Sequence, residues 1–134
     1  MSGDTVTSIS ALQFTNDNKF AYAYSGQFAT SASGVTFLQF NTNSEYLNCL
    51  IEVGAGSRTD DDYKVRFYLD NEVVFLKYMN NTYDPLTGIT AFIIPPFSTF
   101  KLTLQNQSTA TANTWSANVT AKVGMAPRVG NLVE

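Results

Sequence analysis

The sequence has no histidine and one cysteine, Cys49, among its 134 residues. Without histidine, the Ser-His-Asp and Cys-His nucleophilic systems, histidine-ligated zinc and the usual general base near neutral pH are excluded. A single cysteine excludes an intrachain disulfide and multi-cysteine zinc or iron–sulfur sites. Cys49 lies in the apolar segment "YLNCLIEV", where we expect a small buried hydrophobic residue. We therefore expect no enzymatic activity and no cofactor.

Charge is scarce as well, since only 14 % of the residues are charged against a usual value of about 25 %. The net charge is −3 and the eight basic residues are scattered, whereas binding of nucleic acid requires clustered Lys and Arg. The N-terminal segment "MSGDTVTSIS" has no basic region followed by an apolar core, so we expect no cleaved signal peptide. No apolar run approaches the roughly 18 residues of a membrane span. We expect neither a nucleic-acid partner nor a membrane span.

Aromatic and small polar residues take the place of charge. The chain has ten Phe and seven Tyr, and its polar residues are mainly Asn, Thr, Ser and Gln. The cores of protein interfaces are depleted in charge and enriched in aromatics, but a β-sandwich rich in Thr and Tyr has a similar composition. The length fits one domain. We expect a single domain over residues 1–124 and a flexible C-terminal tail over residues 125–134, where Gly and Pro break the pattern.

Apolar and polar residues alternate with period 2 through most of the chain, and no stretch keeps a helical period. The clearest segments are "YLNCLIEV", "YKVRFYLD" and "TWSANVTAKV". The residues expected to point inward are Leu47, Cys49, Ile51, Val53, Val65, Phe67, Leu69, Trp115, Ala117, Val119, Ala121 and Val123. The predicted fold class is all-β: an antiparallel β-sandwich of eight or nine strands, jelly-roll-like.

Turn residues divide these strands. Asp70-Asn71 predicts a two-residue hairpin loop, because Asp and Asn tolerate positive φ. "SGQFATSASG" (residues 25–34) and "NNTYDPLTG" (residues 80–88) predict loops. Pro95-Pro96 separates two apolar strands in "ITAFIIPPFSTFKLTLQ". Proline cannot donate to a β-ladder, so we expect a corner at which the chain leaves one sheet and enters the other.

Two residue groups are candidates for binding. Asp60, Asp61 and Asp62 follow "GAGSRT", and the spacing predicts a solvated loop, with a calcium site as the alternative. Seven tyrosines could form a sugar-stacking platform, but Tyr on a strand more often belongs to a core or an interface. These are Tyr22, Tyr24, Tyr46, Tyr63, Tyr68, Tyr78 and Tyr83. We assign no catalytic, cofactor-binding or metal-binding residue from the sequence.

The segment from Val73 to Val123 resembles small virion proteins of bacteriophages and related viruses. The resemblance depends on the "IIPPFST" stretch (residues 93–99), the strand "FKLTLQN" after it and the closing strand "TWSANVTAKV". The hairpin "YLDNEVVF" before them also matches the pattern of a short turn preceding a Val-rich strand. The resemblance implies a jelly-roll subunit of a viral particle that acts as a capsid vertex (penton) or a capsid decoration protein.

The expected partners are then other copies of the chain, in a ring or trimer, and a major capsid protein, and the expected location is the virion. Two other classes stay open. One is a carbohydrate- or receptor-binding sandwich, lectin-like and associated with a fibre or tail. The other is an unrelated β-sandwich.

Overall fold

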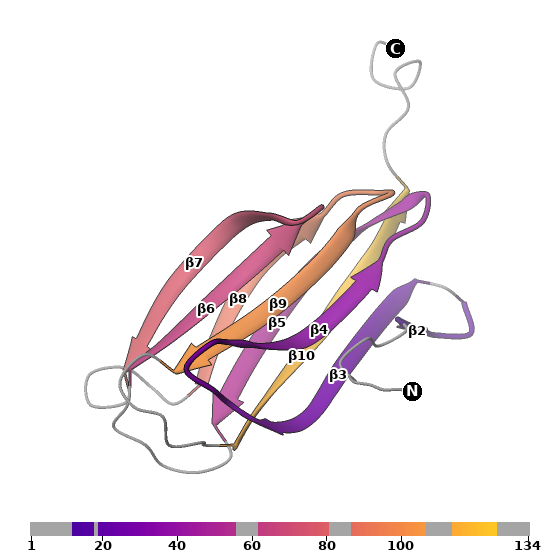
Figure 1. Cartoon of the computed structure of the whole chain (residues 1–134). Helices are drawn as coiled ribbons and strands as arrows, with labels where there is room; N and C mark the ends of the chain where they lie inside the picture. The colour runs from indigo at the N-terminus through magenta and orange to yellow at the C-terminus, as the bar shows by residue number, and fades with distance from the viewer. Residues whose placement is uncertain (1–11, 18, 56–61, 81–86, 107–113, 126–134) are drawn as a thin grey trace, which may run out of the picture.

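The structure, a computed structural model, describes residues 12–17, 19–55, 62–80, 87–106 and 114–125. This part of the chain contains nine β-strands in two antiparallel sheets and no helix (Figure 1). The strands are β2 (Gln13–Phe14), β3 (Phe20–Ala29), β4 (Val35–Asn41), β5 (Glu45–Ala55), β6 (Asp62–Leu69), β7 (Glu72–Asn80), β8 (Thr87–Ile94), β9 (Thr99–Asn106) and β10 (Thr114–Met125). The predicted all-β sandwich is confirmed.

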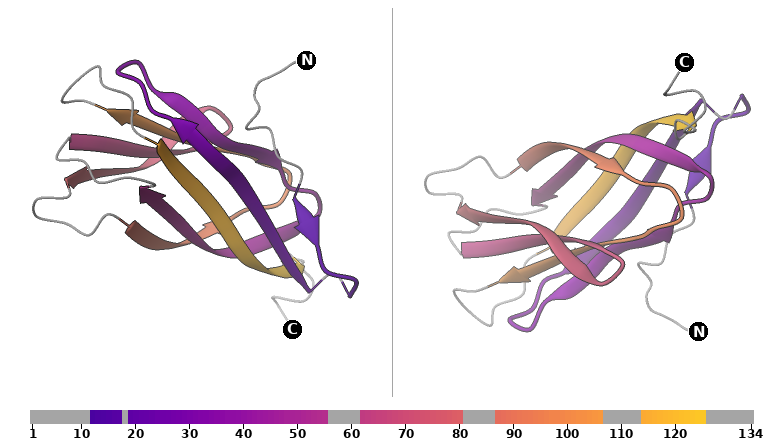
Figure 2. Two further views of the ribbon diagram at one scale, coloured as in Figure 1. Left: turned by 90° about the horizontal axis from the view of Figure 1, so that it is seen from below. Right: turned by 90° about the horizontal axis from the view of Figure 1, so that it is seen from above.

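The strand order is that of a jelly roll. One sheet has the order β2-β3-β10-β5-β8 and the other β4-β9-β6-β7. The pairings are nested: β3 pairs with β10, β4 with β9, β5 with β8 and β6 with β7. The chain is thus a long antiparallel ribbon rolled into two layers, as Figure 2 shows from two directions.

The core lies between the two sheets and comes from the alternating positions. Ten of the twelve residues expected to point inward are buried, and the other two, Leu69 and Val123, are partly buried and pack against the core. The largest fully buried side chains include Trp115, Tyr63, Phe37, Phe67 and Phe100. The rings of Phe67 and Phe100 form an edge contact with centroids 5.5 Å apart. β6 and β9 are the two central strands of the four-stranded sheet. Their aromatic side chains therefore lie at the centre of one wall of the core.

The two prolines lie at the corner that the sequence predicts. β8 belongs to the five-stranded sheet and ends at Ile94, and β9 belongs to the four-stranded sheet and begins at Thr99. Phe97 has a φ of 55° and its backbone N–H donates to the carbonyl of Asn43 at 2.8 Å. The chain therefore changes sheets within four residues, and the predicted crossing is confirmed.

The predicted hairpin loop is also confirmed, since Asp70 and Asn71 join β6 to β7 with φ of 51° and 70°. The prediction of a loop over residues 25–34 is wrong for its first half, because β3 continues to Ala29. A β-bulge explains the difference. The register between β3 and β10 shifts by one residue at Ser25 and Gly26, and Gly26 has a φ of 77°, so a glycine accommodates the irregularity within the strand.

Some of the expectations concern residues that the structure does not describe. These residues are Asp60 and Asp61, residues 81–86 of the predicted loop and residues 126–134 of the expected tail. Asn80 ends β7, Thr87 and Gly88 begin β8, and β10 continues to Met125. The described part of the chain has no helix long and apolar enough to cross a membrane.

Candidate interaction surface

The outer faces of the two sheets differ in chemistry. The face over β6 and β9 is polar: Arg66 donates to the Gln105 side chain at 2.9 Å, and the Lys101 ammonium lies 4.4 Å from the centre of the Tyr68 ring. The edge strand β7 adds the exposed Val73, Leu76 and Tyr78 to this face. The charged side chains at its centre have polar or aromatic partners within the same sheet.

The outer face of the five-stranded sheet begins with a row of aromatic side chains on β3. Ala21 and Ala23 are buried, so strand alternation turns their neighbours outward. Phe20, Tyr22 and Tyr24 are 47 %, 49 % and 58 % exposed. Large aromatic residues are thus presented to solvent on the side of the strand opposite the core.

The other side of the same face is aliphatic. Leu50 on β5 is 53 % exposed, and Ile89 and Ile93 on β8 are 63 % and 59 % exposed. These three residues and the aromatic row of β3 define what we call the apolar face: Phe20, Tyr22, Tyr24, Leu50, Ile89 and Ile93. Single exposed hydrophobic residues are ordinary on protein surfaces, but a group of this kind on one sheet suggests a contact surface.

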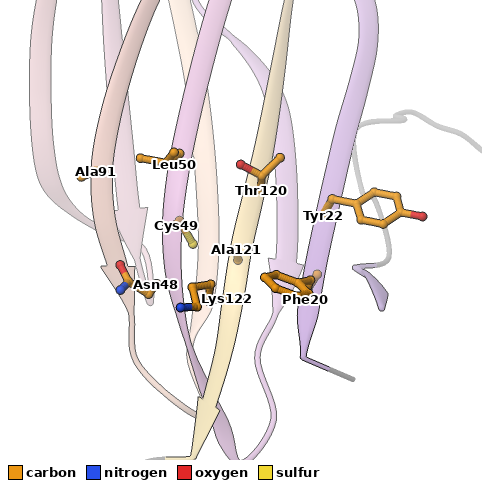
Figure 3. A pocket seen from close by; sticks show the side chains of 10 residues that line it. Phe20, Tyr22, Asn48, Cys49, Leu50, Ala91, Thr120, Ala121 and Lys122 are labelled. Atoms are coloured by element: carbon orange, nitrogen blue, oxygen red, sulfur yellow. The ribbon is translucent and has the colours of Figure 1, made fainter. Parts of the chain in front are cut away.

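Strand β10 runs between the two halves of the apolar face. Thr120 is opposite Tyr22 on β3 and Leu50 on β5, so its short side chain leaves a hollow between two larger ones. The depression has a volume of about 500 Å³. Figure 3 shows Phe20 and Tyr22 on one side of it and Leu50 on the other, with Thr120 and Lys122 on the strand between them.

The chemistry of this depression favours contact over catalysis. Besides the Tyr22 hydroxyl, its polar side chains are Asn48, Thr120 and Lys122, and Lys122 carries the one charge among its lining residues. Cys49 lies beneath, 1 % exposed, and burial raises the pKa of its thiol from 9.0 to about 12. A thiol with a raised pKa remains protonated and is a poor nucleophile. The prediction of a small buried Cys49 is confirmed.

The sequence-based candidates are distributed over the molecule. Asp62 is the first residue of β6, and the described residues contain no group of three His, Cys, Asp or Glu side chains able to hold a metal ion. Tyr63 is buried, while Tyr22 and Tyr24 lie on the apolar face and Tyr78 on the opposite sheet. The tyrosines that the structure describes therefore form no single platform, and Tyr83 lies outside the described residues. The alternation of β3 is visible in the sequence, but Leu50, Ile89 and Ile93 were not among the candidate residues predicted from it.

No protein-family model matches the sequence, and a search of curated proteins found no match. The structure is similar to a Bacillus endospore appendage described as a disulfide-linked pilus, at 11 % identity over 94 % of this chain and 100 % of that chain, with a TM-score of 0.55. It is also similar to the VP2 subviral particle of infectious bursal disease virus, at 14 % identity over 80 % of this chain, with a TM-score of 0.51. This chain spans 32 % of that VP2 chain. The β-sandwich is thus shared with a pilus protein and a viral capsid protein.

Proposed function

We propose that the chain is a non-enzymatic structural subunit that assembles into a viral particle, as a capsid vertex (penton) or capsid decoration protein. The observation that carries the proposal is the apolar face on a jelly-roll sandwich. Interface cores are depleted in charge and enriched in aromatic residues, and the exposed residues Phe20, Tyr22, Leu50 and Ile93 fit that composition. The similarity in fold to VP2 is consistent with this role.

The proposed partners are other copies of the chain, in a ring or trimer, and a major capsid protein. A rigid two-layered sandwich suits such an assembly, because its sheets keep exposed side chains at fixed positions. A closed ring requires one patch on each subunit to meet a different patch on the next. The apolar face and the polar face over β6 and β9 provide two unlike patches.

A disulfide-linked polymer is a less suitable model. The similar Bacillus pilus is described as disulfide-linked, whereas this chain has one cysteine, and Cys49 is buried at 1 % exposure. An intermolecular disulfide through Cys49 would require β5 to open. Assembly through noncovalent contacts is therefore the form that we propose.

Mass spectrometry of purified particles from a host culture tests this role. We expect the chain at a fixed copy number per particle, and the number distinguishes a vertex protein from the more abundant decoration protein.

A variant with Tyr22→Lys and Leu50→Lys should fold and yet be lost from particles, since two charges would enter the apolar face. The control Phe97→Lys, at a corner residue that is 77 % exposed and belongs to neither face, should be retained. Absence of the wild-type chain from particles would exclude the role.

A second function has one observation in its favour: the exposed aromatic row on β3 borders a depression of about 500 Å³ with Asn and Thr side chains. Aromatic rings combined with a few polar groups are also typical of small-ligand sites. A lectin-like module should bind defined sugars on a glycan array and lose that binding when Tyr22 becomes Ala. Tyr78→Ala, which removes a 61 % exposed ring from the other sheet, is the control.

A further inference from the structure

The edge strands of the two sheets differ in how well they are protected. In the five-stranded sheet, one edge is formed by β3 and the two-residue strand β2 that pairs with it, and the other edge is β8. In the four-stranded sheet, the edges are β4 and β7. An edge strand exposes unpaired backbone N–H and C=O groups that can pair with another chain. Folded proteins prevent such pairing with bulges, inward charges or prolines on the edge. These features can be compared strand by strand.

Three edge strands have a bulge. In each case, the edge strand has one extra residue relative to the strand with which it pairs. The register shifts at Ser25 and Gly26 of β3, at Phe37 of β4 and at Val74 of β7. β7 also has Lys77 opposite the inward-facing Val65, so its charge lies on the interior side of the sheet. Each of these strands is locally bent away from the geometry that a partner strand needs.

β8 has none of these protections. Its eight residues, Thr87–Ile94, pair with β5 in unbroken register from Gly54 to Leu47. The strand contains no charged residue and no proline and has β-branched residues at five of its eight positions. No other described strand pairs with its free side. β8 is therefore a regular, uncharged template for a further strand.

We propose that β8 is the strand through which two copies of this chain join, antiparallel and edge to edge, about a two-fold axis at Ala91. The five-stranded sheets of the two copies would then form one continuous sheet. This inference goes beyond the proposed function, because it depends on the edge strands and applies to an assembly of any kind. A second copy is the occupant because an isologous contact requires self-complementarity, and the sequence of β8 has it.

The self-complementarity can be followed residue by residue. With Ala91 opposite Ala91 of the second copy, Ile89 is opposite Ile93 of that copy, and Thr90 is opposite its Phe92. The two outward isoleucines are thus opposite each other, while on the inward side the ring of Phe92 is opposite the smaller Thr90. Since β8 carries no charge, no like charges meet across the axis. An aromatic residue opposite a β-branched one, such as Phe92 opposite Thr90, is a cross-strand pair that stabilises a sheet.

The apolar face gives a second reason for this partner. Leu50 is opposite Ala91 in the register of β5 and β8, so Leu50, Ile89 and Ile93 surround the proposed axis. A two-fold axis at Ala91 brings this aliphatic half of the face together with its copy. The exposed aliphatic residues, 53–63 % accessible in the single chain, would then form one patch that the strand pairing aligns.

Cysteine cross-linking tests the contact and its register in the full-length chain. Residues directly opposite in an antiparallel pair have Cα atoms about 4.5–5.5 Å apart, within the range of a disulfide. We expect Ala91→Cys to form a covalent dimer under mild oxidation. Ile89→Cys should not, because it would face Ile93 rather than itself, whereas the double variant Ile89→Cys with Ile93→Cys should. The wild-type chain should not form disulfide-linked dimers, since its one cysteine, Cys49, is buried.

The matched control is Val73→Cys on the bulged strand β7, where the side chain is 52 % exposed. It should remain uncross-linked. Equal cross-linking of Ala91→Cys and Val73→Cys, or none of Ala91→Cys, overturns the proposal. Circular dichroism of each variant ensures that a misfolded chain is not counted.

Charge pairing provides a second measurement that does not depend on oxidation. By sedimentation velocity, Ile89→Lys alone and Ile93→Glu alone should each weaken the dimer at least tenfold in Kd, and the double variant should recover most of the loss. A monomeric wild-type chain at its highest soluble concentration contradicts the inference. So does a double variant no better than the single ones. A chain present in particles that fails these tests retains the proposed function and loses this contact.

Discussion

Thr42 and Ser98 hold together two connections between the sheets. The backbone N–H of Ser98 donates to the hydroxyl of Thr42 at 2.9 Å, and the backbone N–H of Thr42 donates to the carbonyl of Ser98 at 2.9 Å. The Thr42 hydroxyl in turn donates to the carbonyl of Pro95 at 2.7 Å. Thr42 lies between β4 and β5, and Ser98 lies between β8 and β9. One buried hydroxyl therefore provides hydrogen bonds that the proline corner cannot supply through a β-ladder.

Replacing this hydroxyl should destabilise the fold. Thr42 is 6 % exposed, and Thr42→Val would leave the Ser98 N–H and the Pro95 carbonyl without their partner. We expect the free energy of unfolding to fall by about 1–3 kcal/mol, measured by urea denaturation. Thr120→Val, at an exposed position on β10, is the control and should change stability by less than about 0.5 kcal/mol. Equal effects of the two substitutions would show that the corner does not depend on Thr42.

The ring of Tyr46 covers Gly124 across the β5–β10 pair. The two residues are opposite in register, and a Cβ at Gly124 would lie 2.6 Å from Cζ of the tyrosine. We expect Gly124→Ala to destabilise the wild-type chain by about 1 kcal/mol, because the ring must move. In a Tyr46→Ala background the same change should be neutral or favourable, since glycine weakens a strand. Thermal unfolding of the wild type, the two single variants and the double variant gives the coupling energy between the two positions. A coupling energy near zero would show that the Tyr46 ring does not restrict position 124.

The fold was more predictable from the sequence than the surface. Period-2 alternation identified the inward positions, and the proline pair identified the sheet crossing, because both depend on local geometry. The bulge at Ser25 and Gly26 was not predictable in the same way. Ser and Gly are also common in loops, and the hydrogen bond that stabilises the bulge, from Ala117 N–H to the Ser25 hydroxyl at 2.9 Å, joins residues far apart in sequence.

The apolar face was predictable only in part. Alternation separates Tyr22 from Ala21, but it cannot show that Tyr22 and Leu50 face the same side of one sheet. That relation depends on β10, which is last in sequence and lies between β3 and β5. The missing protection of β8 was equally hidden, because an edge is defined by the strand order and a bulge by the register with a neighbour.

Burial of Cys49 gives the chain a specific dependence on alkaline pH. Because burial raises the pKa of the folded thiol from 9.0 to about 12, the unfolded chain loses this proton first. The contribution of Cys49 to stability is constant below about pH 9 and decreases above it, by at most about 1.4 kcal/mol per pH unit. We expect wild type to lose more stability than Cys49→Val between about pH 9 and 10. Parallel loss in both proteins, measured by urea denaturation, would contradict the shift.

Lys77 should protect β7 from pairing with other chains. Its side chain borders a small gap between the sheets lined by Val53, Val65, Phe67 and Thr90, so an incoming strand would bury its charge. Burying an unpaired charge is unfavourable. We expect Lys77→Val to retain the fold and to increase association, seen as larger species in light scattering at equal concentration. Lys64→Val, on the outer face of β6, removes the same charge without exposing an edge. If it raises association as much as Lys77→Val, net charge rather than edge protection controls solubility.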